Sequence, residues 1–191
     1  MAKIKPVIEE TKGFIAVSPK GKAKWCKWKQ PDQFGKYGVD LYVENEEARQ
    51  EFIAKLEELK EKAKQEVLAK GKKIMLDMPV YKEDDEGNIF FKFTRDAKKR
   101  DGTEVKIPIY NVYGKEDKEF DSLIGNGSII KVKYAANPYY IPATKMLGVS
   151  LKLLAIQVIE LKEYTEGGGS EGFTNEADDD FTADTKDSVP F

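Results

Sequence analysis

Alternating apolar and polar residues mark the first part of the chain as strand material. Residues 14–17 read FIAV, residues 23–29 read AKWCKWK, and residues 37–43 read YGVDLYV. In the last stretch an apolar residue occupies every second position, which is the period of a half-buried strand. A loop separates the second stretch from the third, because QPDQFGKYG carries the proline and glycines that break regular structure. We therefore expect several strands before residue 44.

A helical period follows. Asn45 suits a helix N-cap, and two glutamates come directly after it, in the first turn. Apolar residues then recur at the spacing of one buried helix face up to about Lys70. Gly71 stands where a glycine commonly ends a helix. The sequence predicts one long helix here, with an apolar stripe of Phe52, Leu56, Leu59, Ala63 and Val67.

Strand patterns return after the helix. Residues 88–95 read NIFFKFTR, and Asp101-Gly102 joins them to EVKIPIYNVY at 104–113. An Asp-Gly pair between two apolar runs is a strong hairpin signal, so we expect a second strand at 104–113.

Two longer strand patterns complete this part of the chain. They read IIKVKYAANPYY at 129–140 and MLGVSLKLLAIQVIELKEY at 146–164. Pro138 and Pro142 bracket Tyr139 and Tyr140, so we expect both tyrosines in the loop between the two strands.

Five or more strands around one helix indicate a mainly β protein. A small Greek-key β-barrel, the OB-fold, accommodates this inventory, and a β-sandwich is the alternative. We expect one domain over residues 1–164. A Gly-rich linker and an acidic C-terminal tail then occupy residues 165–191, and their low apolar content predicts disorder.

Charge is unevenly distributed between these two parts. The whole chain has 32 basic and 34 acidic residues, a net charge of -2. From Thr165 onward there are eight acids and one base, which leaves 31 basic and 26 acidic residues before it. The body is therefore about +5 and the tail about -7, which suits a body that binds polyanions. The tail residues that we expect to contact partners are Asp178, Asp179, Asp180, Asp184, Asp187 and Phe191.

The composition argues against several classes of function. The chain has no histidine and one cysteine, Cys26, so a zinc site is implausible and Cys26 is expected to be a small packed residue. We see no nucleotide-binding loop, paired catalytic carboxylates or nucleophile motif, and we expect no enzyme activity, metal or cofactor. No apolar run approaches the roughly 20 residues of a membrane span, and the N-terminus lacks the apolar core of a signal peptide. We expect a cytoplasmic protein.

Lysines and aromatic residues are interleaved in three of the strand patterns. Alternate side chains of a strand share a face, so Lys131 and Lys133 point away from the apolar row of their strand. Cations can follow the phosphates of a single strand, while flat rings stack on unpaired bases at about 1–3 kcal/mol per base. The pattern favours single-stranded nucleic acid bound along one cationic, aromatic-lined groove of the barrel. The candidate residues are Lys131, Lys133, Tyr139, Tyr140, Lys92, Trp25 and Lys27.

Ordinary packing explains part of the same pattern. Lysines alternate with apolar residues in any half-exposed strand. At least two of the three phenylalanines at positions 90, 91 and 93 belong in the core. Trp25 and Trp28 are three positions apart and face opposite ways in a flat strand, so we expect one of them in the core. The sequence leaves open which one.

The order of several short motifs resembles a known family. LIGNGSIIKVKYAANPY is followed by GVSLKLLAIQVIEL, a Gly-rich hinge, an acidic tail and a terminal phenylalanine. Together with the MAKI start, GKYGVDLYVEN, DMP and FKF, this order resembles the single-stranded DNA-binding proteins of T7-type bacteriophages.

The resemblance implies an OB-fold with one prominent helix and sequence-independent binding of single-stranded DNA. It also implies strand annealing, a role in phage DNA replication and recombination, and homodimers. By position, Lys131, Lys133 and Tyr139 match the DNA-contacting residues proposed for the family. The acidic tail with Phe191 matches the segment that contacts the replicative DNA polymerase and the helicase-primase.

The tail suggests a competition with DNA. We expect it to occupy the cationic face in the free protein and to be displaced by DNA, because both are negatively charged. Two alternatives remain from the sequence: an RNA-binding OB-fold protein, or a protein-interaction module with no nucleic-acid role.

Overall fold

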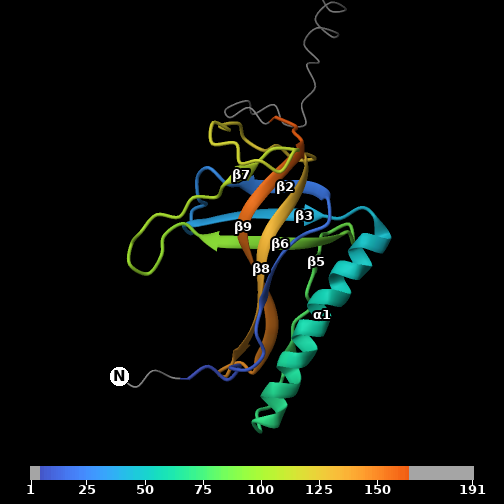
Figure 1. The fold of residues 1–191 in the computed structure, drawn as a ribbon. Helices are drawn as coiled ribbons and strands as arrows, with labels where there is room; N and C mark the ends of the chain where they lie inside the picture. The colour runs from blue at the N-terminus through green and yellow to red at the C-terminus, as the bar shows by residue number, and fades with distance from the viewer. Residues whose placement is uncertain (1–4, 164–191) are drawn as a thin grey trace, which may run out of the picture.

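The computed structural model describes residues 5–163. The predictions on the tail, from Asp178 to Phe191, lie outside these residues. Within them the chain forms one helix and a nine-stranded sheet (Figure 1). The elements are β1 (Phe14–Val17), β2 (Gly21–Lys27), β3 (Lys36–Tyr42), α1 (Glu46–Ala69), β4 (Leu76–Asp77), β5 (Lys82–Glu83), β6 (Ile89–Asp96), β7 (Ile109–Tyr110), β8 (Ile129–Ile141) and β9 (Met146–Glu160).

Five strands close into a barrel. The antiparallel pairs β2–β3, β3–β6, β8–β9 and β2–β8 form four sides of the ring. The fifth side is a parallel contact between β6 and β9, where Thr94 pairs with Lys152. This ring order is that of an OB-fold, so the predicted barrel is confirmed and the sandwich alternative is wrong.

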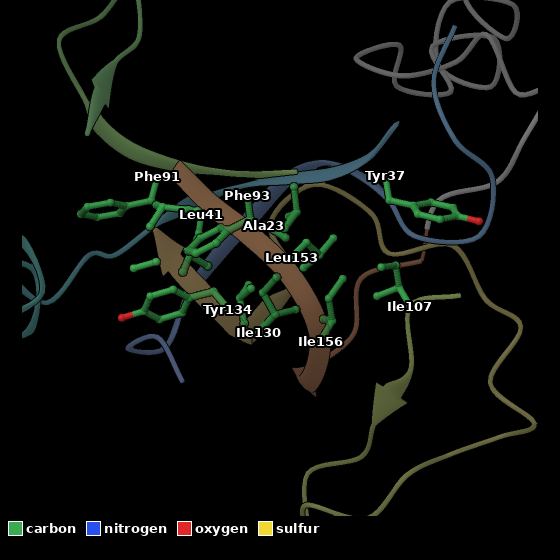
Figure 2. Close-up of a cluster of buried hydrophobic side chains, with 14 of the residues drawn as sticks. Ala23, Tyr37, Leu41, Phe91, Phe93, Ile107, Ile130, Tyr134, Leu153 and Ile156 are labelled. Atoms are coloured by element: carbon green, nitrogen blue, oxygen red, sulfur yellow. The ribbon is translucent and has the colours of Figure 1, made fainter. Parts of the chain in front are cut away.

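The barrel interior is filled by the alternate side chains that the sequence pattern predicts. Figure 2 shows Leu41 and Phe93 facing Tyr134 and Leu153 across this interior. Phe91 and Phe93 are fully buried, as the core assignment of two phenylalanines predicts. Strand β8 buries its apolar row and leaves Lys131 half-buried and Lys133 exposed, which confirms the expected alternation.

Helix α1 follows the predicted pattern closely. The Asn45 side chain accepts a hydrogen bond from the Ala48 N–H at 2.9 Å, and Gly71 has a φ of 75° after the last turn. The residues of the predicted stripe are all buried. No helix in residues 5–163 is long and apolar enough to cross a membrane.

The strand expected at 104–113 is largely absent. The Asp101-Gly102 turn forms, but only the bridge between Lys98 and Glu104 follows it. Pro108 has no N–H to donate, and the rest of the run up to Tyr113 contains only the short strand β7, which pairs with β9 rather than with β6. The hairpin prediction was therefore right about the turn and wrong about the second strand.

The loop expected at Tyr139 and Tyr140 is also wrong. Both residues lie in β8, where they pair with Gly148 and Leu147 of β9. Strand β1 pairs with β8 no further than Ala136, so beyond that point β8 is an edge that tolerates a proline. The β8–β9 hairpin thus extends past the barrel, alongside the C-terminal half of α1 (Figure 1).

Candidate nucleic-acid interface

Two adjoining hollows lie on the outer face of β3 and β6. The first, of about 390 Å³, lies between the β2–β3 loop and the two strands. The second, of about 320 Å³, lies between β6, residues 78–82 and the β8–β9 hairpin. They share Lys92 and Thr94, and we call them together the outer-face groove.

The β2–β3 loop presents an aromatic ring to this groove. Phe34 is 75% exposed and lines the first hollow. One carboxylate oxygen of Asp32 accepts the backbone N–H groups of Phe34 and Lys36, each at 2.9 Å. The hydrogen bond from Lys36 is the main cause that holds the pKa of Asp32 below 3.8. These hydrogen bonds therefore fix the turn and keep the Phe34 side chain exposed.

Trp25 reaches the same hollow through a β-bulge. The register between β2 and β3 shifts between Lys24 and Lys27, and Trp25 has a φ of 53° there. Its N–H donates to Oδ1 of Asn126 at 2.9 Å. The bulge leaves Trp25 66% exposed, with its side chain lining the groove next to Lys27.

Trp28 takes the other role. Its ring lies 5.4 Å from that of Phe120, and its Nε1 donates to the Ser122 carbonyl at 3.1 Å. It packs against the core. The structure thus shows which of the two tryptophans is packed: Trp28 packs against the core, and Trp25 is exposed.

Cys26 lies between the two tryptophans and packs against the core. Burial raises the pKa of its thiol to about 12. The thiolate is therefore disfavoured at neutral pH, which fits the expected packed residue and not a nucleophile.

A row of charged side chains crosses the middle of the groove face. Lys24 on β2 pairs with Asp40 on β3, and Asp40 pairs with Lys92 on β6. Lys92 Nζ lies 3.9 Å from Oδ1 of Asp40. Burial raises the pKa of Asp40, while Lys92, Lys82 and Lys24 lower it to a smaller extent. The floor of the groove thus holds one largely buried carboxylate among cations.

Tyr139 lines the second hollow, from the β8–β9 hairpin. It is the cross-strand partner of Gly148, and a methyl group added at Gly148 would lie 2.6 Å from Cζ of Tyr139. The ring is therefore packed directly on the glycine backbone. This contact fixes the ring in place and leaves it half-buried at the edge of the groove.

Tyr140 points elsewhere, because successive side chains of a strand face opposite ways. Its hydroxyl donates to the Lys73 carbonyl at 2.6 Å, and its ring packs near Ala63, Val67 and Leu147. The structure does not bring Tyr140 to the groove.

Lys131 and Lys133 also lie away from the groove. They project from β8, opposite Gln157 and Ala155 of β9, and line neither hollow. In the barrel ring β8 sits between β2 and β9, across from β3 and β6, and in Figure 1 it crosses in front of them. The single groove expected from the sequence therefore holds Lys92, Trp25, Lys27 and Tyr139 but not this lysine pair.

Several residues of the groove were not predicted from the sequence. Phe34 is an aromatic residue inside a polar Pro/Gly loop, and this contrast was the available signal. Asp40 and Lys82 carried no such signal, since their position depends on strand register. The missed residues are Phe34, Lys36, Asp40, Lys82 and Thr94.

The closed barrel with a cationic, aromatic-lined outer face defines an OB-fold protein of the oligonucleotide-binding kind. Residues 19–161 match the model of the family described as single-stranded DNA-binding protein, Bacteriophage T7. The chain belongs to this family, which confirms the resemblance seen in the sequence.

Two relatives agree with this assignment, and two solved structures share the fold. The single-stranded DNA-binding protein of Escherichia phage T7 is 28% identical over 76% of this chain and 69% of its own. That of Enterobacteria phage T3 is 30% identical over 76% and 70%, respectively. The crystal structure of the single-stranded DNA-binding protein encoded by Bacteriophage T7 superimposes with a TM-score of 0.65 at 24% identity, covering 86% of this chain and 96% of that chain. A C-terminal truncation of the single-stranded DNA-binding protein from bacteriophage Enc34 gives a TM-score of 0.50 at 12% identity, covering 86% and 99%.

Proposed function

We propose that this protein binds single-stranded DNA along the outer-face groove, with broad tolerance of sequence. The observation that carries the proposal is the convergence of exposed rings and lysines on one face of an OB barrel. Trp25 and Phe34 stand at one end of the groove and Tyr139 at the other, with Lys92 between them. Membership in a family of single-stranded DNA-binding proteins supports the same conclusion.

The groove residues divide the work between bases and backbone. The rings of Trp25, Phe34 and Tyr139 offer stacking surfaces, and any base can stack on them. Lys27, Lys36 and Lys92 supply the cations for phosphates. Each phosphate contact releases counterions, so the affinity should fall as salt rises.

The experiment is a fluorescence anisotropy titration with labelled oligo-dT, oligo-rU and duplex DNA. We expect tight binding to oligo-dT and much weaker binding to the duplex. Equal affinity for rU and dT would favour the RNA-binding alternative, and no binding to any of them would favour a protein-interaction module.

A matched pair of lysine variants locates the site. Lys92→Ala should weaken oligo-dT binding and reduce the salt slope, because it removes a cation at the centre of the groove. Lys62→Ala removes an exposed helix lysine paired with Glu58 and should leave both unchanged. If Lys131→Ala and Lys133→Ala weaken binding while Lys92→Ala does not, the DNA lies on the β8 face instead.

Wider roles follow from the family and the charge of the chain. We propose that the protein protects and anneals single strands during phage DNA replication and recombination, as a homodimer in the host cytoplasm. The acidic tail with Phe191 would recruit the replicative DNA polymerase and the helicase-primase, and would compete with DNA for the cationic body. The segregation of about -7 in the tail from about +5 in the body supports this competition.

A further inference from the structure

Asp40 is out of place in a groove for a polyanion. It lies on the outer face of β3 and lines the first hollow, between the lysines of the neighbouring strands. Its side chain keeps 12% of its surface exposed, so it reaches the floor of the groove without standing out from it. A carboxylate at this point repels phosphate, and its presence needs another explanation.

A simple structural ion pair does not account for it. The Lys92 ammonium lies 3.9 Å away, which is too far for a direct hydrogen bond. Burial raises the pKa of Asp40, so its charged form is less favourable here than in water. The carboxylate therefore costs stability at neutral pH, and its oxygens retain capacity to accept hydrogen bonds.

We propose that Asp40 accepts hydrogen bonds from the Watson–Crick edge of one bound base, and that this position of the groove favours guanine. The inference rests on the proposed function, and it adds one selective position to a groove that otherwise tolerates any sequence.

The chemistry of the bases gives the order of preference. Guanine presents two adjacent donors, N1–H and the N2 amino group, which match the two oxygens of a carboxylate. Cytosine and adenine each offer one exocyclic amino group. Thymine offers N3–H between two carbonyl oxygens, and these repel a carboxylate. We therefore expect guanine to bind best and thymine worst.

The surrounding cations support a base rather than a phosphate at Asp40. Lys24 and Lys92 flank the carboxylate across the strands, and Lys92 lines both hollows, where its ammonium can contact phosphates. A strand held this way turns its bases toward the floor, where Asp40 lines the same hollow as the exposed rings of Trp25 and Phe34.

The test uses the full chain and the shortest oligo-dT that binds it. One central thymine is replaced in turn by guanine, inosine, cytosine or adenine, and each affinity is measured by competition. We expect guanine to bind about fivefold or more tightly than thymine, from the usual discrimination of a bidentate contact. Inosine lacks the N2 amino group and should lose much of this gain.

Variants then assign the preference to one residue. Asp40→Asn should bring guanine and thymine within about twofold of each other. Asp121→Asn removes an exposed carboxylate paired with Lys29, outside the groove, and should keep the wild-type ratio. Equal affinities of the wild type for all five oligonucleotides would overturn the inference, as would an unchanged ratio in Asp40→Asn. Absence of binding to any of them would overturn the proposed function itself.

Discussion

Trp25 combines two properties that rarely occur together in one residue. Its backbone lies in the left-handed region, at a φ of 53°, and its large side chain is 66% exposed. A non-glycine residue in this region costs about 1–3 kcal/mol, and such strain concentrates at functional sites. The strained backbone of the bulge therefore lowers stability, but it turns the Trp25 ring toward the groove.

This arrangement predicts opposite effects for the two tryptophans. Trp25→Ala should weaken oligo-dT binding by about 1–3 kcal/mol, because one stacking surface is lost. Its free energy of unfolding should change little, since the side chain makes few core contacts. Anisotropy and chemical denaturation measure the two quantities.

Trp28→Ala serves as the counterpart. It should lower the free energy of unfolding by about 2–4 kcal/mol, because a packed ring is removed. Its effect on DNA affinity, measured under conditions where it is folded, should be small. Quenching of tryptophan fluorescence by DNA should persist in Trp28→Ala and vanish in Trp25→Ala; the reverse pattern would contradict the assignment.

For single residues, the sequence predicts which face of a strand a side chain occupies better than it predicts which residues lie beside it in space. The alternation in β8 correctly separated Lys131 and Lys133 from the apolar row, and two of the three phenylalanines of β6 are buried as expected. The roles of Trp25 and Trp28 depended on a one-residue bulge, which no spacing reveals. Asp40 looked like an ordinary strand residue until the register placed it beside Lys92.

Among the elements, α1 holds the N-terminal segment through a single carboxylate. Glu66 accepts the backbone N–H groups of Glu9 at 2.7 Å, Glu10 at 3.0 Å and Thr11 at 2.8 Å. Burial raises the pKa of Glu66, but the hydrogen bonds from these donors together lower it by more, so the pKa lies well below 4.5. The segment leads directly into β1, so this contact also positions the first strand.

The lowered pKa sets a pH dependence. Because the pKa of Glu66 is lower in the folded protein than in the unfolded chain, the ionised carboxylate stabilises the fold at pH values above the unfolded pKa. This stabilisation is lost as the pH falls below about 4.5. Glu66→Gln offers one oxygen to several donors and should cost about 1–3 kcal/mol at pH 7. The difference from the wild type should shrink as the solution is acidified.

Chemical denaturation across pH measures this effect. Glu58→Gln, which removes an exposed carboxylate paired with Lys62, should be nearly neutral at every pH. A Glu66→Gln variant as stable as the wild type at pH 7 would contradict the proposed clamp.

Substitutions in the β8–β9 hairpin test the contact between Tyr139 and Gly148. Gly148→Ala should displace the Tyr139 ring from its packed position. We expect oligo-dT binding to weaken by about 1 kcal/mol or more, because a stacking surface moves. Tyr139→Ala should have a similar effect, and the double variant should be no worse than the stronger single one.

Tyr140→Ala is the matched control on the same hairpin. It should lower the free energy of unfolding, since the ring packs on α1, and leave the affinity unchanged. Loss of affinity in Tyr140→Ala with none in Tyr139→Ala would reverse the assignment.

Elements with a strong period were predictable, and those set by distant pairing were not. Helix α1 matched its caps and stripe, because both are local properties. The run at 104–113 has strand propensity, but Pro108 and the available edge of β9 reduced it to the two residues of β7. The prolines around Tyr139 and Tyr140 indicated a loop, whereas an unpaired strand edge accommodates Pro138.

For the molecule as a whole, cationic side chains lie on two different faces of the barrel. The groove lies over β3 and β6, and the Lys131–Lys133 pair lies on β8 across the ring. The sequence predicted the cations of both faces but, without the ring order, could not separate them.

A truncation ending at Gly169 removes most of the tail acids and should bind oligo-dT several-fold more tightly at low salt, because a competing anion is gone. The gain should diminish as salt rises, since screening weakens both interactions. Equal or weaker affinity of the truncation would refute the competition.

The closure of the barrel has a consequence for biosynthesis. Strand β9 alone pairs with β4, β6, β7 and β8, and β6 meets it across more than fifty intervening residues. Such distant pairings form slowly, and in a nascent chain they must wait until the last strand has left the ribosome. An incomplete chain would expose unpaired strand edges and lack a finished groove, so translation arrest before residue 146 should yield a species that neither refolds nor captures DNA.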